Sequence, residues 1–208
     1  MLFRSRAPAA VEIHPLLAGR WSPYCFAERP VPTGDLHALF EAARWAPSSY
    51  NEQPWAFLVA SRDTRPDAHA RLLDCLWDVN REWARFAPVL GLGLARPTFD
   101  RNGVSNPAAE HDLGLAMGML TVEATARDLQ VHQMMGLDPD RARSLFRIPA
   151  DWTPRVAFAL GYAGLQPDMA PELQSRDAER RPRRTVDAFV FDAEAGWGHA
   201  YPFDEPGP

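Results

Sequence analysis

The chain has 208 residues, of which 46% are hydrophobic and 24% charged, with a formal net charge of -5. These values are typical of a globular domain with a substantial core; they exclude a disordered chain, and the acidic balance gives no reason to expect nucleic acid. No apolar run approaches the length of about 20 residues that a membrane-spanning helix needs, and the N-terminus lacks an uninterrupted signal-peptide core.

The basic residues and the cysteines limit the possible reaction types and the cellular compartment. The sequence contains no lysine, so Schiff-base chemistry is excluded, and Cys25 and Cys75 stand alone without Cys-x-x-Cys spacing. Isolated cysteines favour a reducing compartment. We therefore expect a cytoplasmic protein with one domain over residues 1–208, in which residues 1–13 form an N-terminal arm and residues 192–208 a C-terminal tail.

The first candidate binding residues follow the N-terminal arm, in the run Gly19-Arg20-Trp21-Ser22-Pro23-Tyr24. Arg20 and Ser22 alternate, so on an extended backbone their side chains point the same way. A guanidinium group and a hydroxyl on one side could hold a phosphate. A surface arginine near a turn explains the same residues at least as well.

A polar loop follows a predicted helix over residues 34–44, for which Thr33 is the expected N-cap. Pro47 ends the helix, and Pro54 precedes an apolar run over residues 56–60 that predicts a strand. The loop between them carries four neutral hydrogen-bonding side chains, Ser48, Ser49, Asn51 and Gln53. Such a loop suits a planar heterocycle, and an ordinary turn explains it with equal weight.

The middle of the chain predicts a helix, a buried strand and a second helix. Helical spacing extends over residues 67–86, with Asn80 among the apolar positions, where an internal hydrogen bond is a commoner role than ligand contact. Residues 87–95 predict a strand whose Gly91 and Gly93 permit close approach to one face. Residues 96–108 resemble a loop, and the part over 96–106 is a candidate lid.

The helix predicted over residues 109–129 is apolar nearly all round. Gly114 and Gly118 stand four residues apart and permit close contact with another helix. A dimer interface and a central position in the chain's own core both explain this pattern.

The last third of the chain contains three further predicted elements. Asp138-Pro139 opens a helix that extends to about Arg147, residues 153–162 form a strand, and residues 185–191 form a last strand. Before that last strand comes the basic cluster Arg180-Arg181-Pro182-Arg183-Arg184, which either binds an anion or forms a solvated basic face.

Several reaction classes lack their residues. The sequence has neither a phosphate-binding Gly-x-x-x-x-Gly-Lys-Ser/Thr loop nor a Gly-x-Ser-x-Gly elbow, and no two histidines have metal-ligand spacing. We therefore expect no metal site and no catalytic side chain. A polar ligand loop without such groups is typical of a protein whose cofactor carries the chemistry.

The order of these features resembles the FMN-dependent nitroreductase family, over roughly residues 16–190. The family signature Ala-Pro-Ser-Ser-x-Asn-x-Gln-Pro-Trp is present in full over residues 46–55. Arg20 and Ser22 match the first two positions of the family's Arg-x-Ser-x-Arg/Lys element, and Tyr24 replaces its last basic residue. The resemblance implies FMN-contacting roles for Arg20, Ser22, Tyr24, Pro47, Ser48, Ser49, Asn51, Asn80, Gln133, Met134, Met135, Gly136, Arg181 and Arg183, with Arg180 and Arg184 as register alternatives to the last two.

The resemblance also implies an architecture and an activity. The expected fold is α+β, a mixed sheet flanked by helices, in an intertwined homodimer with FMN at the subunit interface. The Pro47–Ser49 part of the loop then serves mainly the FMN of the other subunit. The expected reaction is ping-pong transfer of electrons from NAD(P)H, a transient donor, through flavin N5 to a nitroaromatic, quinone or enone.

Three expectations about the site are less constrained by the sequence. Trp83, Phe99 and His111 are weak candidates for the substrate pocket, and Trp83 replaces a residue that is basic in some family members. A specialised flavin enzyme that oxidises a substrate or cleaves FMN, and a non-catalytic FMN-binding or storage protein, are the alternative functions. An α+β domain without any cofactor is the remaining alternative.

Overall fold

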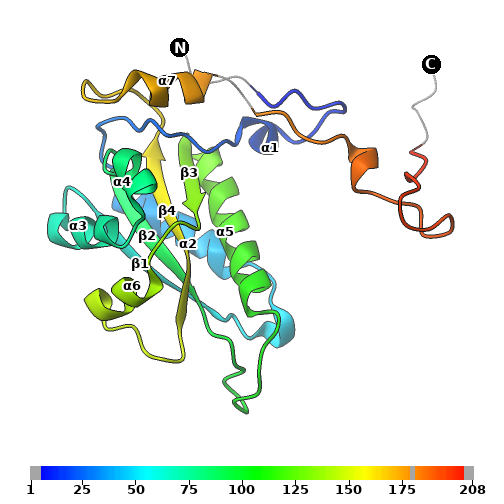
Figure 1. Ribbon diagram of the computed structural model, residues 1–208, viewed down its shortest axis with the longest axis horizontal. Helices are drawn as coiled ribbons and strands as arrows, with labels where there is room; N and C mark the ends of the chain where they lie inside the picture. The colour runs from blue at the N-terminus through cyan, green and yellow to red at the C-terminus, as the bar shows by residue number, and fades with distance from the viewer. Residues whose placement is uncertain (1–5, 179–180, 204–208) are drawn as a thin grey trace. The chain divides into compact units, whose positions relative to one another are not determined.

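The computed structural model describes residues 6–178 and 181–203. These residues fall into two units, one within Met1–Ala178 and one within Glu179–Pro208. The first unit contains the sheet and all seven α-helices found in the described residues (Figure 1). None of the described helices is long and apolar enough to cross a membrane.

The centre of the first unit is a four-stranded sheet with the order β1-β2-β4-β3. Its strands are β1 (Trp55–Ser61), β2 (Val89–Ala95), β3 (Leu129–Met134) and β4 (Thr153–Tyr162). All three pairings are antiparallel, so the described residues contain no parallel pair of the kind that a mixed sheet has. The predicted α+β fold is confirmed, and β3 lies at an edge of the sheet.

Two hydrophobic cores cover the two faces of the sheet, because successive side chains of a strand point to opposite faces. Val89 and Ala95 of β2 pack with α2 (Thr33–Arg44) and α5 (Ala109–Ala126). Leu90, Leu92 and Leu94 point the other way and pack with α3 (Pro66–Asp74), α4 (Asp78–Ala84) and α6 (Pro139–Phe146).

The glycine pair of β2 is explained by this packing. A Cβ atom at Gly91 would lie 2.2 Å from a ring carbon of Phe158, and one at Gly93 would lie 2.8 Å from Val156. The close approach predicted at Gly91 and Gly93 therefore comes from side chains of the neighbouring strand β4. It leaves no role for these two glycines in ligand binding.

The helix predicted over residues 67–86 is wrong in one respect, because the structure has two helices there. Trp77 is extended, with φ -63° and ψ 151°, and its N–H donates to the Gly136 carbonyl at 3.0 Å. Leu76 forms an isolated bridge with Leu137, and the Asp138 N–H donates to the Cys75 carbonyl at 2.8 Å. Pairing with a segment some sixty residues away replaces helical hydrogen bonds that local periodicity favours.

Other boundaries differ less. Thr33 is the first residue of α2 and not its N-cap, which is Pro32, and α5 ends at Ala126 because Leu129 begins β3. Asp138 caps α6 as predicted, since its carboxylate accepts from the Arg141 N–H at 2.9 Å. Two short helices, α1 (Pro15–Gly19) and α7 (Pro171–Ala178), were not predicted.

The second unit has little regular structure among its described residues. Val186–Ala188 forms a 3-10 helix, η2, so the strand predicted over residues 185–191 is wrong. Phe191 forms an isolated bridge with Ala200, and its ring packs on that of Trp197 at a centroid distance of 4.7 Å. These contacts join the two ends of the loop over residues 191–200, so its residues pack and form hydrogen bonds within the loop.

Candidate functional site

Arg20 and Ser22 lie side by side directly after α1. Arg20 is extended, with φ -67° and ψ 134°, and its Nη1 donates to the Ser22 hydroxyl at 3.4 Å. Both side chains are half-buried. The predicted juxtaposition of a guanidinium group and a hydroxyl is therefore present, and this pair could bind an anion.

Side chains from β3 fix the backbone that carries this pair. The Trp21 N–H donates to Gln130 Oε1 at 3.2 Å, and His132 Nδ1 lies 2.7 Å from the Pro23 carbonyl oxygen. A carbonyl can only accept, so Nδ1 carries the proton. Gln130 and His132 are two residues apart on β3 and therefore reach the same side of the strand.

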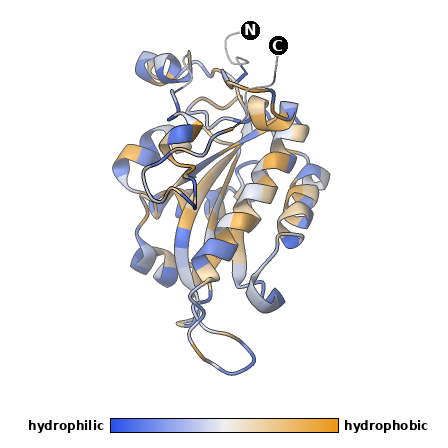
Figure 2. Cartoon of the chain, turned by 90° about the vertical axis from the view of Figure 1, so that its right-hand side faces the viewer, coloured by the Kyte–Doolittle hydropathy of each residue, from blue (hydrophilic) through white to orange (hydrophobic). Residues whose placement is uncertain are grey.

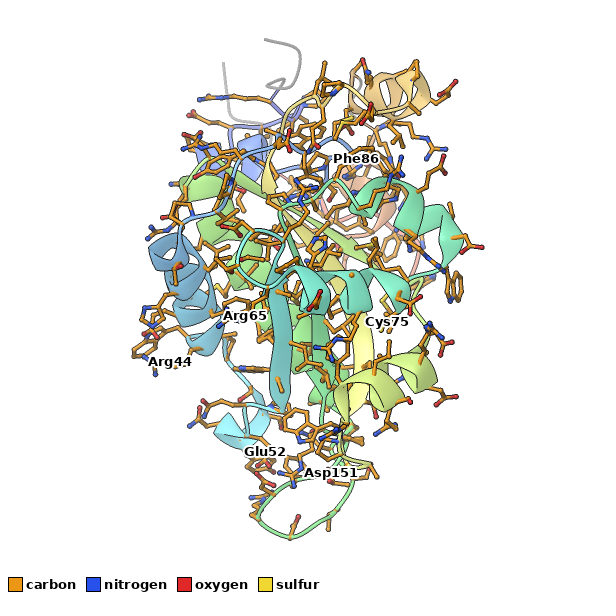
Figure 3. The ribbon with its side chains drawn as sticks, turned by 90° about the vertical axis from the view of Figure 1, so that its left-hand side faces the viewer. Arg44, Glu52, Arg65, Cys75, Phe86 and Asp151 are labelled. Carbon is orange, nitrogen blue, oxygen red and sulfur yellow. The ribbon has the colours of Figure 1, made fainter. Side chains whose placement is uncertain are left out.

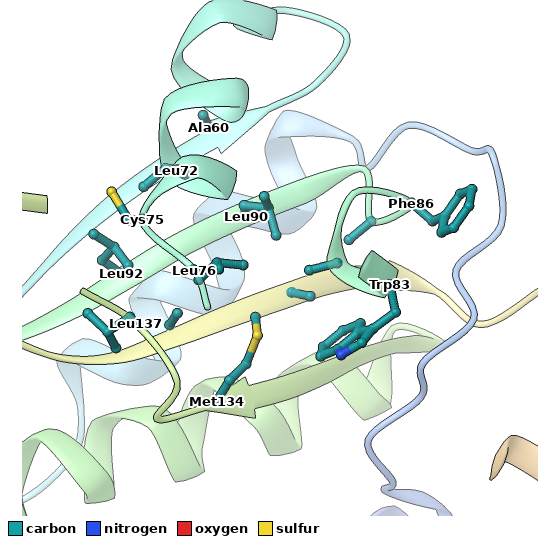
Figure 4. Packing of buried hydrophobic residues seen from close by; sticks show 14 of the residues in the cluster. Ala60, Leu72, Cys75, Leu76, Trp83, Phe86, Leu90, Leu92, Met134 and Leu137 are labelled. Atoms are coloured by element: carbon teal, nitrogen blue, oxygen red, sulfur yellow. The ribbon is translucent and has the colours of Figure 1, made fainter. Parts of the chain in front are cut away.

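Tyr24, Trp83 and His132 form an aromatic cluster under the Arg20–Ser22 segment. The Tyr24 ring meets Trp83 edge-on at a centroid distance of 5.2 Å, and His132 stacks on Trp83 at 4.3 Å. Trp83 is only 2% exposed and lies in the same core cluster as Met134 (Figure 4). The prediction that Trp83 borders an open substrate pocket is wrong, because its indole ring fills the core.

Asn80 and Gly136 come together although 56 residues separate them. Asn80 Nδ2 donates to the Gly136 carbonyl at 3.0 Å, and a Cβ atom at Gly136 would lie 2.5 Å from that nitrogen. Asn80 therefore makes an internal hydrogen bond, which was the commoner of its two expected roles. That bond fixes the segment that the resemblance places against FMN.

The segment after β3 offers backbone donors. Among the described residues, the N–H groups of Met135 and Gly136 have no hydrogen-bond acceptor. Met135 is 71% exposed, whereas Met134 is buried and points into the core. Gln133 is exposed and donates to Thr121 Oγ1 at 3.3 Å. The exposed backbone of residues 135 and 136 could thus donate to an acceptor atom of a ligand.

The loop over residues 48–53 is locally strained. Tyr50, Asn51 and Gln53 have φ values of 55°, 57° and 52°, in the left-handed region that side chains other than glycine disfavour. Each such residue costs about 1 to 2 kcal/mol, and asparagine tolerates the conformation best. Strain of this kind persists only where other contacts enforce it, and it is common at functional sites.

The contacts that hold the loop in this strained conformation come from other residues of the loop and from α5. Ser48 Oγ accepts from the Gln53 N–H at 3.0 Å, and Gln53 Nε2 donates to the Asn51 carbonyl at 3.0 Å. The Ser49 N–H donates to Asp112 Oδ2 at 2.9 Å. Asp112 is 2% exposed, and its other oxygen lies 3.0 Å from Nδ1 of exposed His111. His111 therefore lies on the surface beside the loop.

The segment over residues 96–106 also supports this loop. It is a hairpin closed by a bridge between Thr98 and Ser105, and the Asp100 N–H donates to Glu52. Arg96 pairs with Asp151, which lies at the same end of the sheet as Glu52 (Figure 3). The Phe99 ring is 8% exposed and meets Tyr50 edge-on at a centroid distance of 5.8 Å. The expectation that Phe99 borders the substrate is wrong, because its ring packs against the loop.

The site residues of the first unit form two groups at opposite ends of α5. The Ser48–Gln53 loop is held at Asp112, near the start of the helix, whereas a Cβ atom at Gly19 would lie 3.6 Å from Thr125, near its end. Thirteen residues of helix separate these positions, on the order of 20 Å. The structure brings Arg20, Ser22 and Tyr24 together, and it brings Asn80 to Gly136, but the loop stands apart from these residues within one chain.

The remaining predicted site residues belong to the second unit. Arg181, Arg183 and Arg184 are exposed, and Arg183 Nη1 donates to the carbonyl groups of Arg181 and Pro182 at 3.0 Å and 3.2 Å. Arg180 lies outside the described residues. No group of His, Cys, Asp or Glu side chains within the described residues could hold a metal ion.

Sequence patterns alone do not identify Asp112 and Asp177 as residues that hold the candidate site. Asp112 accepts from the Ser49 N–H, and Asp177 on α7 accepts from the N–H groups of Tyr24 and Cys25. A signal existed for Asp112, since it is a charged residue in a helix that is otherwise apolar at most positions. No comparable signal existed for Asp177, because α7 lies in a stretch without clear helical periodicity.

Comparisons with known proteins agree with this architecture. The family model described as "Nitroreductase family" matches residues 17–92. A crystal structure of an oxidoreductase containing FMN superposes with a TM-score of 0.82 at 26% identity, covering 90% of this chain and 94% of that chain. The match therefore covers most of both chains.

Two sequence relatives extend the comparison. A Streptomyces coelicolor protein provisionally named NADH dehydrogenase/NAD(P)H nitroreductase is 26% identical over 176 residues, which cover 74% of this chain and 86% of that protein. An uncharacterised 15.4 kDa protein of Mycolicibacterium smegmatis is 32% identical over 88 residues, and this match spans only 58% of that relative and 42% of this chain. Taken with the fold and the family match over residues 17–92, they show that the chain is similar to proteins of the nitroreductase family.

Proposed function

We propose that this protein is a homodimeric, FMN-dependent oxidoreductase that takes electrons from NAD(P)H and passes them to an electron-poor acceptor. Nitroaromatics, quinones and enones are the acceptor classes. The similarity to an FMN-containing oxidoreductase over most of both chains supports the cofactor, and the name of the Streptomyces coelicolor relative supports the electron donor.

The observation that carries the dimeric site is the placement of two half-sites at the two ends of α5. Between those ends α5 exposes an apolar stripe (Figure 2), made of Gly114, Leu115, Gly118, Met119 and Val122. A Cβ atom at Gly114 or Gly118 would meet nothing within 4 Å in the single chain. An exposed stripe of small and apolar residues on a long helix suits contact with a second helix.

In a two-fold symmetric dimer, half-sites at the two ends of α5 can combine into one complete site. If α5 packs antiparallel against its copy and the crossing lies near Gly118, the Asp112 end of one helix meets the Thr125 end of the other. The Ser48–Gln53 loop of one chain then approaches the Arg20–Ser22 segment of the other. This arrangement accounts for two polar half-sites that lie about 20 Å apart along a single helix.

The chemistry of the residues fits FMN. Arg20 and Ser22 offer a cation and a hydroxyl to the phosphate and the ribityl chain, and the free N–H groups of Met135 and Gly136 suit acceptor atoms of the ring. Asn80 fixes the position of Gly136. Arg181 and Arg183 are proposed as further phosphate ligands on the resemblance alone.

FMN, when bound, supplies the two-electron chemistry between NAD(P)H and the acceptor, so no side chain needs to act as acid, base or nucleophile. The residues of this chain have three tasks. They bind the phosphate, they orient the ring through the backbone donors of residues 135 and 136, and they place positive charge and N–H groups where negative charge develops.

The test begins with the protein as purified. We expect a yellow protein whose released chromophore is FMN, whose colour is bleached anaerobically by NADH or NADPH, and is restored by a nitroaromatic compound. A protein that takes up no FMN contradicts the proposal. Bound FMN that neither nicotinamide reduces at a useful rate indicates a binding or storage protein, and reduction without reoxidation by nitroaromatics, quinones or enones indicates a specialised enzyme.

A further inference from the structure

Asp177 is a buried acid with an unusual set of partners. It lies on α7, is 7% exposed, and its two oxygens accept from the Tyr24 N–H at 2.9 Å and 3.0 Å. Oδ2 also accepts from the Cys25 N–H at 2.8 Å. A single carboxylate therefore holds two consecutive peptide groups from a segment that lies some 150 residues earlier in the chain.

A charged carboxylate is costly at this buried position unless its hydrogen bonds stabilise it. Within the described residues Asp177 makes no ion pair, and a buried carboxylate without a cationic partner loses its hydration. Burial raises the pKa of Asp177, and the N–H groups of Tyr24 and Cys25 oppose that rise. Oδ2 accepts from both N–H groups, and Oδ1 accepts from the Tyr24 N–H as well. In an asparagine one of the two oxygens is replaced by an NH2 group, which donates and cannot accept, so at least one contact to the Tyr24 N–H is lost.

Other contacts hold α7 and the segment before it against the core of the first unit independently of Asp177. Met169 and Leu173 are buried in the core, and Gln166 Nε2 donates to the carbonyl groups of Phe26 and Phe86 at 2.7 Å and 3.0 Å. Because these contacts remain when Asp177 is neutralised, we expect Asp177→Asn to keep α7 in place. Asp177 instead acts on the segment that contains Tyr24, only two residues after Ser22.

Cys25 shows how tightly this end of the segment is enclosed. Its side chain is 0% exposed, and burial, followed by the charge of Asp177, raises the pKa of its thiol to about 12. Beyond Cys25 the chain is held at the end of β4, where the Ala27 N–H donates to the Tyr162 carbonyl at 2.8 Å. Asp177 thus extends a fixed stretch of backbone toward Arg20 and Ser22.

We infer that Asp177 is a positioning residue, which holds the Arg20–Ser22 segment in the conformation that binds a phosphate before the ligand arrives. The inference rests on the proposed function, because the phosphate is that of FMN. Gln130 and His132 hold the same segment from β3, and Asp177 holds it from α7. Preorganisation of this kind raises affinity by removing the entropy cost of ordering the segment on binding.

The experiment compares FMN with riboflavin, which lacks the phosphate, on the dimeric apoprotein at pH 7.5. For Asp177→Asn we expect about tenfold weaker FMN binding, the scale at which outer hydrogen-bonding partners of a site act. Riboflavin binding should change by less than about twofold. The matched control is His69→Gln, which alters a buried polar residue that hydrogen-bonds to the Ala87 carbonyl and not to the Arg20–Cys25 segment, and it should leave both affinities unchanged.

A double-mutant cycle with Arg20→Ala separates positioning from general destabilisation. If Asp177 acts through Arg20, the loss of FMN affinity caused by Arg20→Ala should be much smaller in the Asp177→Asn background than in the wild type. Additive losses overturn the inference. So does a folded Asp177→Asn protein that binds FMN as tightly as the wild type, or one that loses FMN and riboflavin equally.

Hydrogen exchange on the wild-type apoprotein keeps the inference testable if Asp177→Asn does not fold. The Tyr24 and Cys25 amides should already be protected without FMN; free exchange that only FMN suppresses would overturn preorganisation. A wild type that never binds FMN contradicts the proposed function and this inference with it. If the wild type binds FMN and Asp177→Asn binds it equally well, this inference is overturned and the proposed function stands.

Discussion

Asp112 and Asp177 hold the two polar loops of the candidate site in the same way. Each carboxylate is buried, at 2% and 7% exposure, and each accepts from backbone N–H groups of a segment distant in sequence. A hydrogen bond to a charged group is stronger than one between neutral groups, and it is short-ranged and directional. Single buried acids can therefore define loop conformations that no regular secondary structure enforces.

Buried His69 gives a prediction for the pH dependence of stability. Burial lowers the pKa of His69, opposed by the hydrogen bond to Ala87 and assisted by the charge of Arg62. The unfolded value is about 6.5, so the native state binds the proton less readily. The stability from neutral His69 is complete above the unfolded pKa and is lost as pH falls through the folded pKa.

The measurement is the Tm of the wild type and of His69→Gln between pH 7.5 and 5. We expect a decrease in Tm toward pH 5 in the wild type and a smaller decrease in the variant. Equal decreases in the two proteins would mean that other groups account for the acid sensitivity.

The positions of site side chains could be predicted from the sequence only where the local backbone geometry determines the direction in which a side chain points. Arg20 and Ser22 were placed on one side because they alternate along an extended backbone, and the structure agrees. Trp83 and Phe99 were expected at an open pocket, yet both are buried, because exposure depends on contacts with residues far away in sequence. Nothing in the sequence distinguishes a core tryptophan from one that faces a ligand.

At the scale of elements, the hydrophobic pattern predicted most of the first unit, but it was wrong for one helix there and for one strand in the second unit. The strand over residues 153–162 and the capped helix at Asp138 were confirmed. The helix over residues 67–86 is broken by pairing with residues 136–138, and the strand over 185–191 is a short 3-10 helix. A segment with high strand propensity forms a strand only where a neighbouring strand is available to pair with it.

Gly118 tests the role proposed for the exposed stripe of α5. In a single chain its Cβ position is open, so Gly118→Glu should gain helix propensity, up to about 1 kcal/mol, at no steric cost. At a helix–helix interface the same change introduces a buried charge. We expect Gly118→Glu to lower the fraction of dimer and to weaken FMN binding, both measured by sedimentation of the FMN-loaded protein.

Gly34 of α2 provides the matched control. A Cβ atom there also meets nothing within 4 Å, and α2 is not part of the proposed contact. Gly34→Glu should leave the dimer and FMN binding unchanged. If Gly118→Glu behaves like Gly34→Glu, α5 does not form the interface.

At the scale of the whole molecule, α5 sets the distance between the two halves of the candidate site. It packs on one face of the sheet, holds the strained loop near its start, and contacts the end of α1 near its last turn. The sequence contained both halves, in Arg20 and Ser22 and in the complete signature over residues 46–55. Their separation along one helix could not be predicted, since it depends on how distant segments dock.

Complementation between subunits tests the central claim, that one FMN site uses the Arg20 segment of one chain and the Ser48–Gln53 loop of the other. Arg20→Ala and Asp112→Ala homodimers should each bind FMN weakly. The heterodimer of the two variants, isolated with two affinity tags, combines an unaltered Arg20 segment with an unaltered loop at one of its two sites. We expect that heterodimer to bind one FMN per dimer with wild-type affinity, whereas a heterodimer no better than its parents would contradict a site shared between chains.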